Sequence, residues 1–162
     1  MRTIFGIFKK YADAQAAVQD LQEKEFNVNE MNAIVQKDIA EEYMNVNPRK
    51  VNTATMKGID QLLAGVLAGK QIVNTHDAGR VYASGSLATE LAKVAESPQA
   101  AGKGLKRALV TFNIPEEVAE AFVAGIRGGG VFFCIRTSNE RSSEAANVLR
   151  FYKGEYVSSY SK

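Results

Sequence analysis

The sequence has few of the residues that build metal and nucleophilic sites. Among 162 residues it contains one cysteine, Cys134, and one histidine, His76. A single cysteine excludes an internal disulfide framework and a multi-cysteine metal site, and a single histidine excludes a histidine-rich one. A metal would depend on carboxylates such as Asp77, which form a poorer ligand set for transition metals. We therefore expect no metal, no cofactor and a reducing, cytoplasmic setting.

The chain also lacks a strong excess of charge and a long apolar segment. It carries 20 basic and 18 acidic residues, for a net charge of +2. Nucleic-acid binders usually have a clustered basic field, so this balance argues against such a partner. The most apolar stretch, residues 62–69 (LLAGVLAG), is far shorter than the ~20 residues that a spanning helix needs, and the first residues do not resemble a signal peptide. We expect no transmembrane segment, while peripheral membrane contact stays open.

Residues 1–38 predict a strand, a helix and a second strand. Residues 4–8 (IFGIF) form a nearly continuous apolar run, typical of a strand that is covered on both faces. Asp13 is a candidate N-cap for a helix whose apolar stripe has helical spacing: Ala14, Ala17, Val18 and Leu21. Residues 31–35 (MNAIV) again predict a strand, which completes a βαβ unit.

A further helix and a second unit of this kind are predicted in residues 110–162. Pro115 can begin a helix, and Gly128 is the expected left-handed residue after it. The inner face of this helix follows one apolar stripe: Val118, Ala121, Phe122, Gly125 and Ile126. Residues 131–137 then predict a strand, residues 144–152 a helix capped by Ser138 or Asn139, and residues 155–160 an alternating edge strand.

The two units look like a repeat. A shift of 128 residues places similar side chains on each other: Phe5 on Phe133, Ile7 on Ile135, Ala17 on Ala145 and Leu21 on Leu149. Between the units, the composition changes near residue 39, and residues 39–109 contain several short helical patterns. Two strand-like runs, residues 71–75 and 80–84, flank His76-Asp77-Ala78-Gly79, so this segment predicts either a hairpin or an ordered loop.

These patterns predict an α+β fold in one domain of residues 1–162. It comprises a first βαβ half (1–38), a mainly helical insert (39–109), and a helix plus the second βαβ half (110–162). Two such halves in one small domain indicate a ferredoxin-like sheet. Because its two helices cover only one face, we expect the insert or a second subunit to cover the other, at Ile4, Phe8, Phe132 and Cys134. A homo-oligomer, first of all a dimer, is therefore expected.

Residues 110–131 (VTFNIPEEVAEAFVAGIRGGGV) resemble a pattern of the bacterial general-stress, or heat-induced stress, protein family, in which an Ile-Pro-Glu-Glu helix runs into a glycine turn and a strand. The opening FGIF at residues 5–8, LLAG at 62–65 and GRVYASG at 79–85 are similar to that family as well. The resemblance covers most of the chain. It implies a stress-linked role without a defined biochemistry, and it supplies no catalytic residues.

No group of residues predicts catalysis, and each candidate has a plain structural interpretation. The segment GVLAGKQ (65–71) is similar to a phosphate loop, but it has three residues between its glycines instead of four and Gln after the Lys. His76 and Asp77 are an acid–base pair or a solvated turn, and Cys134 is a nucleophile or an inert packing group. Arg80 and Arg136 could bind an anionic ligand or form surface ion pairs.

Two hypotheses about function follow. The first is a non-enzymatic, cytoplasmic, stress-associated protein that acts through self-association or through an unidentified protein partner. The alternative is a ligand-binding or enzymatic ferredoxin-like domain with a pocket between sheet and insert, lined by polar groups such as His76, Asp77, Arg80 and Arg136. The second hypothesis requires these side chains to converge on one cavity.

Overall fold

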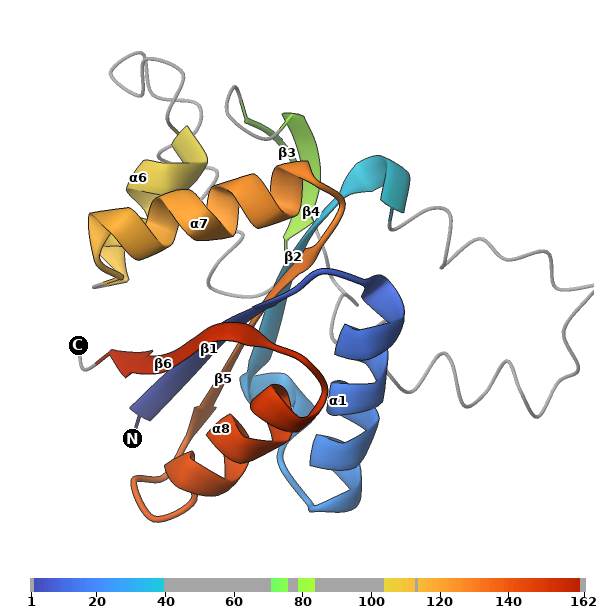
Figure 1. The fold of residues 1–162 in the computed structure, drawn as a ribbon, viewed down its shortest axis with the longest axis vertical. Helices are drawn as coiled ribbons and strands as arrows, with labels where there is room; N and C mark the ends of the chain where they lie inside the picture. Colours follow the sequence, from blue (N-terminus) through green and yellow to red (C-terminus); the bar gives the residue numbers. More distant parts are fainter. Residues whose placement is uncertain (1, 40–70, 76–78, 84–103, 113, 161–162) are drawn as a thin grey trace, which may run out of the picture.

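The computed structural model describes residues 2–39, 71–75, 79–83, 104–112 and 114–160. They form a six-stranded sheet of order β3-β4-β2-β5-β1-β6 with helices on both faces (Figure 1). The mixed α and β character predicted from the sequence is confirmed. The elements are β1 (Arg2–Phe8), α1 (Tyr11–Glu23), β2 (Met31–Gln36), β3 (Gln71–Thr75), β4 (Gly79–Ala83), α6 (Gly104–Thr111), α7 (Glu116–Arg127), β5 (Val131–Thr137), α8 (Ser142–Phe151) and β6 (Glu155–Tyr160).

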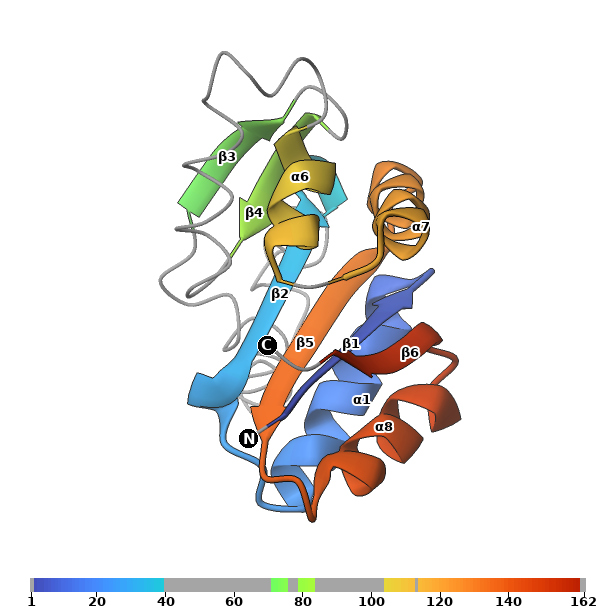
Figure 2. The same cartoon turned by 90° about the vertical axis from the view of Figure 1, so that its left-hand side faces the viewer.

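All neighbouring strands of the sheet are antiparallel. Strand β5 lies between β1 and β2. Because β5 is antiparallel to both of them, β1 and β2 run parallel to each other, and they are joined through α1. In the same way, β1 lies between β5 and β6, which are joined through α8. The two predicted βαβ units are thus interleaved, because the first strand of each unit lies between the two strands of the other unit. Figure 2 shows α1 and α8 on the same side of these strands.

The segment between the units contributes a hairpin to the sheet. Strands β3 and β4 pair antiparallel from Gln71↔Ala83 to Thr75↔Gly79. Strand β4 also pairs with β2, where Val35 lies opposite Tyr82. Of the two interpretations left open by the sequence, the hairpin is the correct one. Of the short helical patterns predicted in residues 39–109, those within residues 40–70 and 84–103 lie outside the described residues.

Two apolar layers lie on opposite faces of the sheet. On the face covered by α1 and α8, the buried side chains include Ala17, Leu21, Phe133, Ala145 and Leu149. On the other face, α6 and α7 contribute Leu105, Leu109, Phe122 and Ile126, which pack with side chains of β1 and β5. The second face is therefore covered by helices of the same chain. One of these helices, α7, lies outside the predicted insert of residues 39–109.

The four residues that were expected to share the second face lie on two faces. Ile4 and Phe8 belong to the α1/α8 layer, whereas Phe132 and Cys134 belong to the α6/α7 layer. The strand register explains this, because Ile4 pairs with Ile135. Alternation shows which residues of one strand share a face, but it does not show how two strands align, and an offset of one residue reverses the faces.

The 128-residue repeat holds in the helices and fails in the strands. Ala17 and Ala145 are both buried in the α1/α8 layer. Phe5, however, faces α6 and α7, while Phe133 faces α1 and α8. The strand-to-helix connections differ in length, residues 9–10 in the first unit and 138–141 in the second. The register of the strands is therefore independent of the register of the helices.

Several predicted helix boundaries also need correction. Helix α1 has Lys10 at its N-cap, three residues before the predicted Asp13, and α8 has Arg141 at its N-cap. After α7, Gly128 has φ −80° and the left-handed residue is Gly129, at φ 95°. The buried side chains of α7 are Ala119, Phe122, Val123 and Ile126, so its inner face is rotated from the predicted stripe.

Helices α1, α7 and α8 end with the same backbone hydrogen bond. The donors and acceptors are Phe26 N and Leu21 O (3.0 Å), Gly130 N and Gly125 O (2.9 Å), and Gly154 N and Leu149 O (2.8 Å). Before each donor stands a left-handed residue: Glu25 (φ 67°), Gly129 (φ 95°) and Lys153 (φ 71°). This is the Schellman arrangement, in which glycine is the usual left-handed residue. Glu25 and Lys153 adopt it with a side chain present.

Candidate functional site

The predicted ligand-binding residues do not meet within the described part of the chain. Arg80 on β4 and Arg136 on β5 are both exposed. Alternation places Arg80 on the face of Tyr82, toward α1 and α8, and Arg136 on the face of Cys134, toward α6 and α7. The two arginines therefore lie on opposite faces of the sheet. His76 and Asp77 fall outside the described residues.

Cys134 lies in the apolar layer under α6 and α7. Its side chain is buried, and burial raises the pKa of the thiol to about 12, although a hydrogen bond with Asn32 acts in the opposite direction. A thiol with such a pKa is almost fully protonated at neutral pH and is a poor nucleophile. The packing interpretation of Cys134 therefore fits its surroundings.

The other expected interface residues are buried as well. Ile4, Phe8 and Phe132 are each at most 1% exposed, so none of them can contact a second subunit directly. Within the ranges described above, no three His, Cys, Asp or Glu side chains are grouped so that they could hold a metal ion. Nor does any helix there have the length and apolar character needed to cross a membrane.

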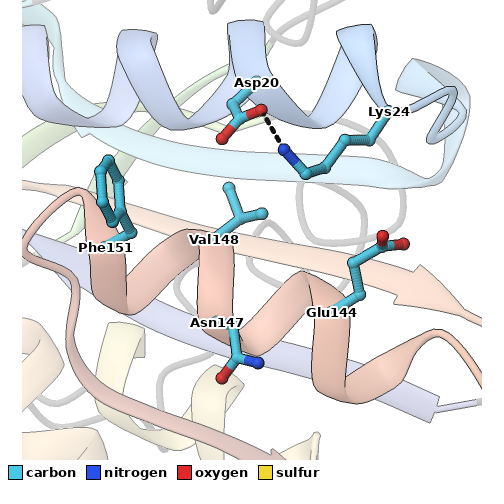
Figure 3. A pocket seen from close by; sticks show the side chains of 6 residues that line it. All are labelled: Asp20, Lys24, Glu144, Asn147, Val148 and Phe151. Atoms are coloured by element: carbon cyan, nitrogen blue, oxygen red, sulfur yellow. Dashed lines mark hydrogen bonds and ion pairs between the residues drawn. The ribbon is translucent and has the colours of Figure 1, made fainter.

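An open groove runs between α1 and α8. Its lining residues, shown in Figure 3, are Asp20, Lys24, Glu144, Asn147, Val148 and Phe151. Lys24 Nζ lies 2.6 Å from Asp20 Oδ1, and the phenyl ring of Phe151 is 78% exposed. The pKa of Lys24 is raised, first by its hydrogen bond to Asp20. The groove thus combines one apolar wall with a lysine that is already paired.

The other charges beside this groove are engaged with each other. Arg141 donates to Glu144 Oε1 at 2.8 Å and to the carbonyl oxygen of Lys24 at 2.7 Å. Its guanidinium also lies 3.8 Å from the centre of the Phe26 ring. Arg141 therefore connects the loop before α8 with the end of α1 across the sequence. These contacts join the two units. The two acidic and two basic side chains named here balance each other, so they give the groove no excess charge that would select a charged ligand.

The second candidate is the outer edge of β6. This strand pairs with β1 on one side, and no other described strand lies beyond it. The pairing is regular from Phe5↔Ser158 to Thr3↔Tyr160, but the register shifts before Ile7↔Glu155. Tyr156 and Val157 together lie opposite Gly6, which is the pattern of a β-bulge. The last residues of β6 thus form a regular strand whose outer side has no partner strand among the described residues. We call this side the open edge.

The bulge directs neighbouring side chains to opposite faces. Tyr156 has a left-handed φ of 55°, and its ring lies 6.2 Å from that of Phe122 at an angle of 86°. The Tyr156 side chain is 56% exposed. Val157 packs against the α1/α8 layer, where a Cβ on Gly6 would be only 3.3 Å from Val157 Cγ2. An exposed aromatic ring therefore lies directly beside the open edge.

Three charged side chains lie at the same end of β6. Lys9 Nζ is 3.2 Å from Glu155 Oε1, and Arg150 Nη2 donates to the carbonyl oxygen of Val157 at 3.4 Å. From residue 156 to residue 160 the strand itself carries no charge. The sequence predicted this edge strand from its alternation. It gave no sign of the bulge, because a left-handed tyrosine has no sequence signature comparable to glycine.

Comparisons of the chain with protein-family models, with curated protein sequences and with solved structures gave no match. The resemblance to bacterial general-stress proteins therefore stays a prediction.

Proposed function

We propose that the chain is a non-enzymatic, cytoplasmic, stress-associated protein with a ferredoxin-like fold, and that it acts by self-association through the edge of β6. The fold assignment is supported by the strand order β6-β1-β5-β2 and by the two interleaved βαβ units. On this proposal, the β3–β4 hairpin and α6 are additions to a ferredoxin-like sheet. The stress association is supported by the sequence resemblance in residues 110–131.

The open edge of β6 is the observation that supports self-association. Exposed strand edges present unpaired backbone N–H and C=O groups, which form a template for another strand. Both faces of the described sheet are occupied by α1, α8, α6 and α7, so backbone hydrogen bonding of the described strands can continue at the two edges, β3 and β6. We assign self-association to the β6 edge. Tyr156 adds an exposed aromatic surface beside it. This route differs from the face-to-face contact that the sequence suggested.

A second copy is the occupant that suits this edge. An antiparallel pair of β6 strands around a two-fold axis at Ser158 places Val157 of one copy opposite Ser159 of the other. No charged residue lies between positions 156 and 160, so the pair brings no like charges together. The net charge of +2 adds little repulsion between two copies. Cyclic two-fold dimers are also the commonest form of homo-oligomer.

Sedimentation velocity over a range of about 1 μM to 1 mM, which spans strong to weak association, tests the proposal. We expect the wild-type chain to shift from monomer to dimer within this range. Ser158→Pro and Ser159→Pro remove successive N–H groups, of which only one faces β1. Loss of the N–H group that faces β1 should lower the melting temperature, whereas loss of the outward N–H group should leave it unchanged. The variant with the unchanged melting temperature should stay monomeric.

Two results would contradict the proposal. One is a wild-type chain that is monomeric over the whole range. The other is a dimer that persists unchanged in a folded proline variant whose outward N–H group is missing. Tyr156→Ser serves as a second probe, because it removes the exposed ring without touching the backbone groups and should weaken the dimer.

A further inference from the structure

We propose that Arg150 regulates the edge of β6. Its guanidinium donates to the carbonyl oxygen of Val157 in this edge strand, and on this proposal it has to move away before a strand of a second copy can pair there. This inference rests on the proposed self-association and adds to it a residue that limits its strength. Arg150 is then an edge-protecting residue, and association of two copies competes with its intramolecular hydrogen bond.

The contact geometry supports this role. Arg150 lies in the last turn of α8 and is exposed, and its Nη2 reaches the carbonyl oxygen of Val157 at 3.4 Å. A guanidinium carries only donors, so it satisfies this acceptor without supplying a new place for a strand to pair. An added strand would need space and an acceptor at the same edge. Charged side chains placed at strand edges are a known protection against unwanted pairing.

A second protective feature, a β-bulge, also includes Val157. The β-bulge at Tyr156 and Val157 disturbs the regular ladder, and bulges are also used to protect edges. By contrast, Ser158 and Ser159 pair regularly with β1. Protection is thus concentrated at the start of β6, while the following residues remain suited to pairing. Removal of Arg150 frees the carbonyl oxygen of Val157 and leaves the side chains of Val157, Ser158 and Ser159 unchanged.

The opposite interpretation makes the opposite prediction. If Arg150 only ties β6 to α8, its removal loosens the strand, and a less ordered strand is a poorer template. Self-association would then weaken. The direction of the change in the dimer dissociation constant therefore separates regulation from simple support.

The experiment compares Arg150→Ala and Arg150→Lys with the control variant Arg80→Ala. Arg80 is an exposed arginine on β4, near the far side of the sheet, and its removal changes the net charge equally. We expect Arg150→Ala to lower the dimer dissociation constant about 5- to 100-fold, because one net hydrogen bond in each of the two copies no longer competes. Arg150→Lys should lie between wild type and alanine, and Arg80→Ala should match wild type.

Amide hydrogen exchange keeps the test independent of global stability. At high protein concentration, residues 157–159 should become more protected in Arg150→Ala than in wild type, with unchanged protection in β5. An unchanged or weaker dimer in Arg150→Ala would overturn the regulatory role and leave the proposed function standing. If neither wild type nor Arg150→Ala associates, the proposed function itself fails. Tighter association of Arg80→Ala to the same extent would show a general charge effect and would also overturn the role of Arg150.

Discussion

The two helical layers of this molecule are assembled differently. In the α1/α8 layer, the helices come from the two distant units, and Arg141 before α8 joins them by donating to the carbonyl oxygen of Lys24 at the end of α1. In the α6/α7 layer, the helices are consecutive, and Lys106 joins them by contacts of 2.8 Å to Glu116 and 2.6 Å to Glu120. The side chain of Lys106 is 11% exposed, that of Lys24 41%. The same sheet is thus covered once by a pair of consecutive helices and once by a pair of helices from distant units with an open groove between them.

The largest effects are expected where each layer has its main anchor. Phe122 in α7 and Leu149 in α8 are both fully buried. Truncation to alanine should lower the free energy of unfolding by about 3–5 kcal/mol for Phe122 and about 2–5 kcal/mol for Leu149, because both transfer energy and packing are lost. Urea denaturation measures both values. If the loss at Phe122 were below about 1 kcal/mol, the α6/α7 layer would contribute far less than α1/α8.

The next effect concerns how closely α7 approaches the sheet. A Cβ on Gly125 would lie 2.7 Å from Ile7 Cγ1, so Gly125→Ala forces α7 away from β1. We expect a loss of about 1–3 kcal/mol, the usual cost of overpacking a close contact. Gly128→Ala is the matched control, since its Cβ would meet the carbonyl oxygen of Ala124 at an ordinary 3.5 Å. Equal melting temperatures for the two variants would contradict the close approach.

A smaller and opposite effect is expected at the helix ends. Glu25 after α1 and Lys153 after α8 have the left-handed backbone conformation that Gly129 has after α7. Glu25→Gly and Lys153→Gly should each raise the free energy of unfolding by about 0.5–1 kcal/mol, because glycine removes the steric cost of this conformation. Gly129→Ala should lower it by a similar amount. Thermal unfolding compares the three, and destabilisation by both glycine variants would contradict the strain.

The smallest effect is the pH dependence of the Lys106 contact in the α6/α7 layer. Glu116 and Glu120 raise the pKa of Lys106 through hydrogen bonds. A raised folded-state pKa means that the stabilisation is complete below the ordinary lysine value of about 10.4 and is lost as the pH rises through the folded value. The wild type should therefore lose stability more steeply than Lys106→Met in alkaline solution. Identical slopes above that pH would show that the contact does not stabilise the fold.

The sequence predicted the elements better than their alignment. Period-two and helical patterns correctly placed β1, β2, β5, β6 and α7, because these patterns follow from local geometry. The same patterns could not place Ile4 and Cys134 on opposite faces, since strand register is a long-range property. Gly125 of the predicted α7 stripe does lie against Ile7, but the buried face is rotated toward Ala119 and Val123.

The candidate site was predicted only in part. An edge strand at residues 155–160 follows from its alternation, and the prediction is confirmed. The bulge at Tyr156 and the contact of Arg150 with Val157 depend on Gly6 and on the position of α8, so no local pattern indicates them. Arg80 and Arg136 were grouped because both are basic residues near strands. Composition alone does not show that they point to opposite faces.

The interleaved connectivity has a consequence for how the chain folds. Strand β1 finds both of its neighbours, β5 and β6, only at the far end of the described chain, where Ile4 pairs with Ile135 and Ser159. A ribosome therefore releases β1 long before any partner strand exists, and its two apolar faces stay uncovered during that time. Contacts of such large sequence separation slow folding and lengthen exposure to aggregation. The segment that completes the sheet last is also the one that carries the open edge.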